Sequence, residues 1–156
     1  TVPLDRSEPL IEDEIGGLTV TAVNTGVPHA VSFVEDVQEV DMETVGPRVR
    51  HADVFPEGAN VTVASRRADG GFDQRTYERG VEAETQSCGT GAVAIGAVAE
   101  RLGLIDTGES VAVHPPGGRL VVTAGEDGAT LEGPVVREFA GQVPDGQGVA
   151  ADAVGD

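Results

Sequence analysis

The sequence predicts an α+β fold in which a curved sheet of mixed or antiparallel strands wraps around one central buried helix. Short stretches of alternating apolar and polar residues recur between turns rich in glycine and proline, and only 3% of the residues are aromatic. This pattern is typical of several short strands joined by tight turns. One helical segment, 91–102, is apolar on nearly every side as far as Glu100. Such a helix is buried all round, and a sheath of strands is the simplest way to bury it.

Eight segments carry the strand pattern. Turn residues separate them at 69–71 (Asp-Gly-Gly), 115–118 (Pro-Pro-Gly-Gly) and 126–128 (Glu-Asp-Gly). The predicted strands are 18–23, 30–34, 59–65, 72–78, 111–114, 119–123, 130–132 and 135–139. We expect these strands to form one sheet, because no internal linker interrupts them.

Two segments are predicted to be helical. The first is short, near Asp41–Val45, with Asp41 as its N-cap and Gly46-Pro47 ending it. The second is the buried helix Gly91–Leu102, with Gly103 as its C′ residue. After residue 143 the sequence is small, glycine-rich and acidic, so 144–156 is expected to be a flexible tail.

The charge of the chain excludes several classes of partner. Its 27 acidic residues against 10 basic ones, all arginine, give a net charge of −17, which repels nucleic acid and anionic membranes. This charge fits either an ordinary soluble acidic protein or a halophilic one, because concentrated salt screens the repulsion between acids. No stretch approaches the roughly 18 apolar residues of a membrane span. A single cysteine and no secretory leader in these residues favour a reducing compartment, the cytoplasm.

The single cysteine, Cys88, precedes a Gly-Thr-Gly turn at the start of the buried helix. The first turn of a helix has free backbone N–H groups and a positive dipole end, which suit a carboxylate or phosphate. Gly89 and Gly91 would let a ligand approach that backbone. The same field favours a thiolate and would lower the pKa of Cys88. The alternative is that Cys88 is simply a small buried apolar residue.

Other residues are candidates for the same functional site only when they are considered together with Cys88. Glu78 and Arg79 end a predicted strand before a glycine, where they are either a solvated charge pair or two groups that reach one pocket. His29 follows a proline turn and Asn60 a glycine turn, and both residue types are common there for structural reasons. No spacing of histidine, cysteine and acidic residues resembles a metal site, and no P-loop or dinucleotide fingerprint is present. We therefore expect no metal and no cofactor.

Taken in order, several segments resemble the C-terminal half of diaminopimelate epimerase over roughly residues 18 to 143. The segments are TGVPHAVSFVEDV, GPRVRHADVFPEGANVTV, RTYERGVEAETQSCGTGAVA, PPGGRLVV and EGPVVREFAGQV. The resemblance implies a cofactor-independent isomerase that interconverts LL- and meso-diaminopimelate in lysine biosynthesis. It also implies two similar lobes, each a sheet around a helix, with one catalytic cysteine from each lobe. Residues 1–143 would then be the C-terminal lobe, with 135–143 packing on an N-terminal lobe.

The resemblance assigns roles at individual positions. Cys88 would be the catalytic cysteine of this lobe, with Glu78 and His29 beside the reacting centre. The implied substrate-binding residues are Asn60, Glu78, Arg79, Gly89 and Thr90, the last two through their backbone N–H groups. The sequence departs from the family at Val27, where asparagine is usual, and in one extra residue near Glu82, where a bulge or longer turn is expected.

The partner cysteine is absent from these residues, so this chain cannot perform a two-base inversion alone. It is either a piece of a full-length enzyme, a lobe that works with a second chain, or one half of a homodimer whose Cys88 thiols face each other. A proline racemase or phenazine-biosynthesis-type isomerase, a non-catalytic binding or assembly domain, and a cysteine hydrolase with His29 as base are alternative functions.

Overall fold

The computed structural model describes residues 2–142, and these form nine strands, two α-helices and one 3-10 helix. The strands are β1 (Asp13–Ile15), β2 (Leu18–Asn24), β3 (Pro28–Phe33), β4 (Asn60–Arg66), β5 (Phe72–Glu78), β6 (Ala83–Glu84), β7 (Ser110–His114), β8 (Leu120–Gly125) and β9 (Gly128–Glu132). The helices are η1 (Val37–Glu39), α1 (Met42–Arg50) and α2 (Gly89–Arg101). The predicted α+β class is confirmed.

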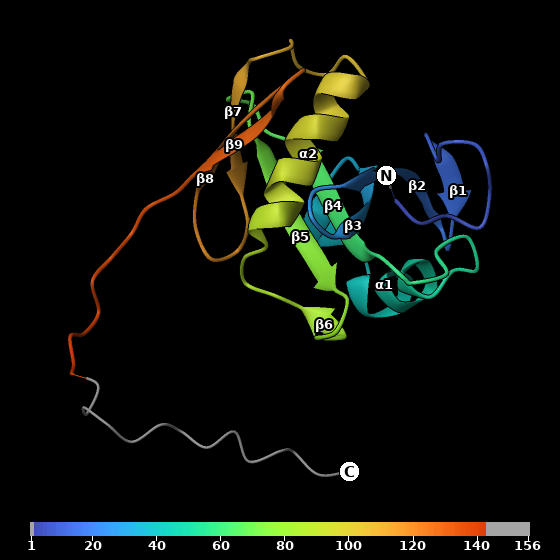
Figure 1. Ribbon diagram of the computed structural model, residues 1–156, viewed down its shortest axis with the longest axis horizontal. Coiled ribbons are helices and arrows are strands. Elements are labelled where there is room, and N and C mark those ends of the chain that lie inside the picture. The colour runs from blue at the N-terminus through green and yellow to red at the C-terminus, as the bar shows by residue number, and fades with distance from the viewer. Residues whose placement is uncertain (1, 143–156) are drawn as a thin grey trace.

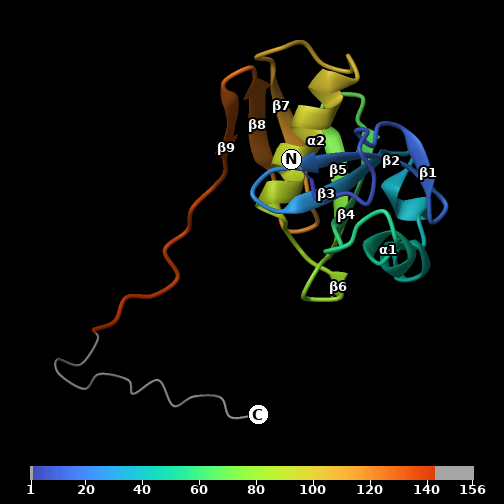
Figure 2. The same ribbon diagram turned by 45° about the vertical axis from the view of Figure 1, so that its right-hand side comes forward.

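The strands make one mixed sheet in the order β1-β2-β3-β4-β5-β7-β8-β9, with β6 paired to β5. The pairs β3–β4 and β5–β7 are parallel, and the other pairs are antiparallel. Figures 1 and 2 show α2 between β7–β9 on one side and β2–β4 on the other. The sheet therefore wraps around α2, as predicted, while α1 packs near β4, β5 and β6.

Helix α2 is buried on most of its surface because its side chains are small and apolar. It begins at Gly89, two residues earlier than predicted, and leaves only one partly exposed row that includes Val93 and Ala97. Gly103 ends it with a φ of 71°, and the N–H groups of Gly103 and Leu104 bond back to the carbonyls of the last turn. This is the Schellman cap that a C′ glycine favours. No helix within residues 2–142 is long and apolar enough to cross a bilayer.

Helix α1 corrects one prediction, because it runs through Gly46-Pro47 to Arg50. Its buried residues Met42, Gly46 and Val49 form one helical face, and packing of that face outweighs the hydrogen bond that proline lacks. Gly46 lies against the ring of Tyr77, where an added Cβ would approach ring carbons to 2.7 Å. Tertiary contact rather than local propensity thus sets the length of α1.

The segment 135–139 is not a strand, which corrects a second prediction. Residues 133–142 have no regular secondary structure and extend away from the sheet (Figure 1). Val135, Val136 and Phe139 are 96%, 79% and 86% exposed. A β-prone sequence forms a strand only where an edge is available to pair with it, and here none lies alongside. The predicted tail, 144–156, lies outside the described residues.

Two short strands were not predicted. Strand β1 pairs with β2 through a hairpin at Gly16-Gly17, where φ is 62° and 100°, and a Gly-Gly dipeptide is a known signal for such a turn. Strand β6 follows a turn in which Glu82 has a φ of 59° and donates its N–H to the carbonyl of Glu78. A turn is therefore present at Glu82, and its extra length relative to the family stays a prediction.

Candidate active site

The two-residue period of three neighbouring strands gathers polar side chains beneath the start of α2. In β3, Val31 packs in the core around α2, so His29, two residues earlier, faces the same way. In β4 and β5, Ala64 and Phe72 belong to that core. Alternation therefore turns the following side chains toward α2: His29, Asn60, Thr62, Gln74, Thr76 and Glu78. The register aligns them, since His29 is opposite Asn60 and Thr62 is opposite Thr76.

Cys88 is the N-cap residue of α2, and 7% of its surface is exposed. Its Sγ lies 3.5 Å from Oγ1 of Thr90. Burial raises the pKa of the Cys88 thiol and the Glu78 carboxylate raises it further, while hydrogen bonds with Thr90 and the Gly91 N–H lower it. Burial dominates, so the expectation that the helix start would lower this pKa is wrong for this conformation. The thiol, rather than the thiolate, is the favoured form at neutral pH.

His29 is fully buried and is held by hydrogen bonds at both ring nitrogens. Nδ1 lies 3.1 Å from Oγ1 of Thr62, and Nε2 lies 3.1 Å from Oγ1 of Thr90. Burial lowers the pKa of His29 from 6.5 to about 4, and the positive charge of Arg79 contributes. The imidazole is therefore neutral at physiological pH.

Asn60, Arg79 and Glu78 are held at the ends of β4 and β5. Oδ1 of Asn60 accepts a 2.7 Å hydrogen bond from the backbone N–H of Arg79, and the Arg79 guanidinium donates to the carbonyl of Glu57 at 3.0 Å. Glu78 accepts a 2.6 Å hydrogen bond from the hydroxyl of Thr85. The residues predicted to form the site therefore meet at the start of α2.

Two ion pairs hold the turn that carries Glu78 and Arg79. Arg50 pairs with Glu82 at 2.9 Å, and Arg75 pairs with Glu84 at 2.7 Å. Arg75 also donates to the backbone carbonyl of Val37 at 2.6 Å. Each arginine side chain is less than one fifth exposed, at 14% and 17%, so these pairs hold better than fully exposed ones do.

The glycines at the helix start lie close to neighbouring protein atoms. A Cβ at Gly91 would lie 2.7 Å from Nε2 of Gln74, and a Cβ at Gly89 would lie 3.0 Å from Leu131. Their missing side chains make room for neighbouring protein atoms, and the approach of a ligand to this backbone stays a prediction. The N–H groups themselves are open: within residues 2–142, those of Gly89 and Thr90 donate to no acceptor. They are suited to bind an anionic oxygen.

Three buried polar residues of the site were not predicted from the sequence. Thr62, Gln74 and Thr76 are each 2% exposed or less and connect His29 to the backbone of Cys88. The sequence did contain a pattern that could have identified them. These residues alternate along strands that are otherwise largely apolar, and polar side chains on a buried strand face are unusual.

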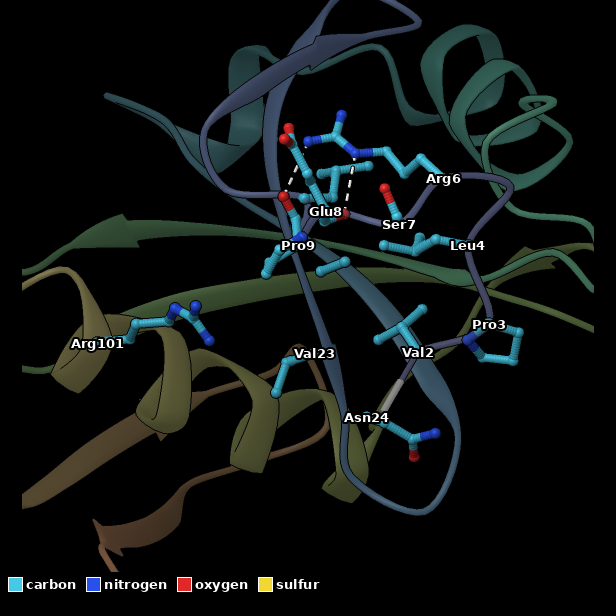
Figure 3. Close-up of a pocket in the computed structure, with 12 residues that line it drawn as sticks. Val2, Pro3, Leu4, Arg6, Ser7, Glu8, Pro9, Val23, Asn24 and Arg101 are labelled. Carbon is cyan, nitrogen blue, oxygen red and sulfur yellow. Dashed lines mark hydrogen bonds between the residues drawn. The ribbon is translucent and has the colours of Figure 1, made fainter.

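A separate cavity of about 630 Å³ lies beside the N-terminal segment (Figure 3). It is lined by residues 2–4 and 6–10, the end of β2 and Arg101, and by none of the predicted site residues. In Figure 3 the Arg6 side chain folds back to the carbonyls of Glu8 and Pro9. The candidate site is thus an open face at the helix start and not this cavity. Within the described residues, no group of three or more histidine, cysteine or acidic side chains could hold a metal ion.

Comparison with known proteins gives a consistent set of relatives. The sequence profile of the family described as diaminopimelate epimerase matches residues 21–138. A protein named diaminopimelate epimerase from Methanothrix thermoacetophila is 47% identical over 144 residues, 92% of this chain and 50% of that protein. Its counterpart from Methanocella arvoryzae is 44% identical over 143 residues, 91% of this chain and 50% of that protein. The chain spans about half the length of the curated relatives it matches.

Solved structures share the fold at low sequence identity. A hydroxyproline epimerase from Agrobacterium vitis, with trans-4-OH-L-proline bound, has a TM-score of 0.52 and 19% identity, covering 79% of this chain and 42% of that one. A PhzF-family phenazine biosynthesis protein from Bacillus anthracis has a TM-score of 0.51 and 16% identity, covering 79% and 37%. The likeness is one of fold.

Proposed function

The chain belongs to the diaminopimelate epimerase family, and on that basis we propose that it supplies one lobe of a cofactor-independent epimerase. The reaction interconverts LL- and meso-diaminopimelate in lysine biosynthesis, in the cytoplasm. The observation that carries the proposal is the position of Cys88, which caps α2 among Glu78, Thr90 and buried His29. Cys88 is the catalytic thiol, and Glu78 and His29 assist it.

The chemistry follows from the weak acidity of the hydrogen at the α-carbon. Inversion without a redox cofactor requires a base on one face of that carbon and an acid on the other. Cys88 supplies one of these groups, and its neutral thiol suits the acid. The free N–H groups of Gly89 and Thr90 bind the substrate carboxylate, where negative charge develops in the transition state. One such donor is worth roughly 3–4 kcal/mol in other enzymes.

The second cysteine must come from a partner lobe. We place that lobe over the open face at the start of α2, where it would exclude water and increase the basicity of a thiolate. The exposed residues Val135, Val136 and Phe139 are suited to pack on it, because apolar side chains at 79% exposure or more otherwise remain in water. The lobe is part of a longer chain, a second chain, or a second copy in a homodimer.

Substrate recognition is assigned to polar groups around the same face. Asn60, Glu78 and Arg79 are the substrate-binding side chains, at the joint of β4, β5 and the turn after β5. Val27 stands where the resemblance implies that asparagine is usual, so one polar contact fewer is expected, and this favours a related amino acid as the second candidate substrate. The corresponding activity would be that of an amino acid racemase or a phenazine-biosynthesis-type isomerase.

Turnover by the full-length protein tests the proposal. Cys88→Ser should abolish epimerisation of LL-diaminopimelate while the circular dichroism spectrum stays unchanged. Ser87→Ala, a change at the exposed neighbouring residue, is the matched control and should retain activity. A parallel assay with proline and hydroxyproline separates the two candidate substrates. Full activity of Cys88→Ser, or a non-catalytic wild type with an inert thiol, would refute the assignment.

A further inference from the structure

We propose that the Thr90 side chain couples the thiol of Cys88 to Nε2 of His29, and that buried polar side chains beneath α2 keep the His29 proton on Nδ1. Thr90 is then a positioning residue for Cys88 through its hydroxyl, in addition to any contact through its backbone. The catalytic consequence rests on the proposed function, whereas the hydrogen-bond arrangement does not.

The orientation of Asn60 determines the tautomer of His29. Oδ1 of Asn60 accepts from the backbone N–H of Arg79 at 2.7 Å, which identifies that atom as the oxygen, because an N–H group can only donate. The other atom, Nδ2, is a donor and lies 3.4 Å from Nε2 of His29. Nε2 is therefore an acceptor, and in the neutral ring the proton is on Nδ1, which donates to Oγ1 of Thr62 at 3.1 Å.

A directed chain continues from Thr62 to the backbone of Cys88. Having accepted from His29, Thr62 donates its own proton to Oγ1 of Thr76 at 3.2 Å. Gln74 donates both Nε2 protons, one to Thr76 at 3.0 Å and one to the carbonyl of Cys88 at 3.1 Å. These side chains are all buried, so the hydrogen bonds between them are stronger than they would be in water. Oε1 of Gln74 has no hydrogen-bond partner within the described residues, and the direction from Thr62 to Thr76 follows from the proton on Nδ1 of His29.

The Thr90 hydroxyl connects the side chain of Cys88 to His29. Its single proton has two acceptors within reach, Nε2 of His29 at 3.1 Å and Sγ of Cys88 at 3.5 Å. With Cys88 as a thiol, the S–H donates to Thr90 and Thr90 donates to Nε2. When Cys88 gives its proton to substrate, the hydroxyl turns to the thiolate, and Nε2 keeps the bond from Asn60. No proton leaves His29, so it acts through Thr90 and not as a base.

Charged groups reach this pair from the end of β5. The Glu78 carboxylate raises the pKa of Cys88, and the Arg79 guanidinium lowers the pKa of His29. Both effects favour a thiol and a neutral imidazole over a thiolate–imidazolium pair. The Thr90 hydroxyl acts in the opposite direction on Cys88, since its hydrogen bond lowers that pKa. Removing the hydroxyl therefore has a predictable sign.

Two measurements on the full-length protein test the inference. The first is the pH dependence of Cys88 alkylation by iodoacetamide, followed by peptide mass spectrometry. Thr90→Val, which keeps the shape and removes the hydroxyl, should move the midpoint upward by about one pH unit, which is about tenfold slower alkylation at neutral pH. Thr90→Ser should restore the wild-type midpoint. Equal midpoints in the wild type and Thr90→Val would overturn the coupling.

The second measurement needs no substitution at Thr90, so it stands even if that variant fails to fold. Nitrogen-15 NMR of the wild-type protein should show Nδ1 of His29 protonated and Nε2 unprotonated at pH 7, with the resonance assigned by its loss in His29→Gln. A proton on Nε2 would overturn the inference. Neither readout requires turnover, so both can succeed in a protein that does not epimerise diaminopimelate, and the proposed function can hold while they fail.

Discussion

Replacing Gly91 with alanine tests how closely the start of α2 packs against the buried polar side chains Gln74 and Thr76 of β5. The added Cβ would lie 2.7 Å from Nε2 of Gln74, 3.1 Å from Oγ1 of Thr76 and 3.2 Å from Sγ of Cys88. Gln74 and Thr76 are each 2% exposed, so neither can swing into solvent. The helix must move away, or Gln74 must release the Cys88 carbonyl.

The magnitude follows from three opposing contributions. Overpacking a well-filled site costs about 1–3 kcal/mol, and leaving the buried Gln74 amide and its acceptor unpaired costs about 1–3 kcal/mol. Alanine gains about 1 kcal/mol over glycine in helix propensity. The free energy of unfolding should therefore fall by about 3 kcal/mol, which at about 2 kcal/mol per molar urea lowers the denaturation midpoint by about 1.5 M.

Gly89→Ala in the same helix is the matched control. Its added Cβ would meet only the end of the Leu131 side chain at 3.0 Å, and Leu131 is 43% exposed and free to shift. The change in unfolding free energy should be within about 0.5 kcal/mol. If Gly91→Ala is as stable as Gly89→Ala, the close packing of the helix start on β5 is refuted.

Three further predictions concern protonation, salt and the extended segment. Burial lowers the pKa of His29 from 6.5 to about 4. The stability contributed by neutral His29 is therefore complete above pH 6.5, and about 3 kcal/mol of it should be lost as pH falls toward 4. Urea titrations should show this loss in the wild type but not in His29→Gln. With a net charge of −17, the melting temperature should rise from about 0.1 M to about 1 M KCl as screening increases, and a flat or falling curve would contradict a halophilic character. In the full-length protein, Phe139→Ser should lower the unfolding free energy by about 1.5–3 kcal/mol if Phe139 packs on the partner lobe, and an unchanged value would exclude that packing.

The strands were predictable where turn chemistry bounds an alternating pattern on both sides. Phe72–Glu78 has the predicted bounds because the Asp69-Gly70-Gly71 turn precedes it and Gly80 follows it. Val135–Phe139 also contains β-prone residues, but it extends away from the sheet, and pairing cannot be inferred from propensity alone. The length of α1 depends on the contact between Gly46 and Tyr77, which is distant in sequence.

Most residues of the candidate site could be predicted from the sequence, but the direction of the pKa shift of Cys88 could not. The glycine-rich turn after Cys88 and the turns before His29 and Asn60 marked these residues. The register of β3, β4 and β5 aligns His29 with Asn60 and Thr62 with Thr76. The sequence favoured a lowered pKa for Cys88 from the helix start, but the degree of burial reverses that direction. Thr62 and Gln74 became part of the site only once their buried hydrogen bonds were visible.

Deuterium incorporation from solvent tests most directly the claim that Cys88 transfers a proton at the α-carbon. The full-length protein is incubated with LL-diaminopimelate in D₂O, beside Cys88→Ser, and deuterium at the α-carbon of the meso product is measured by NMR. The wild type should place solvent deuterium in the inverted product, and Cys88→Ser should form no such product while retaining its fold. Deuterated meso product at the wild-type rate in Cys88→Ser would contradict the assignment of Cys88.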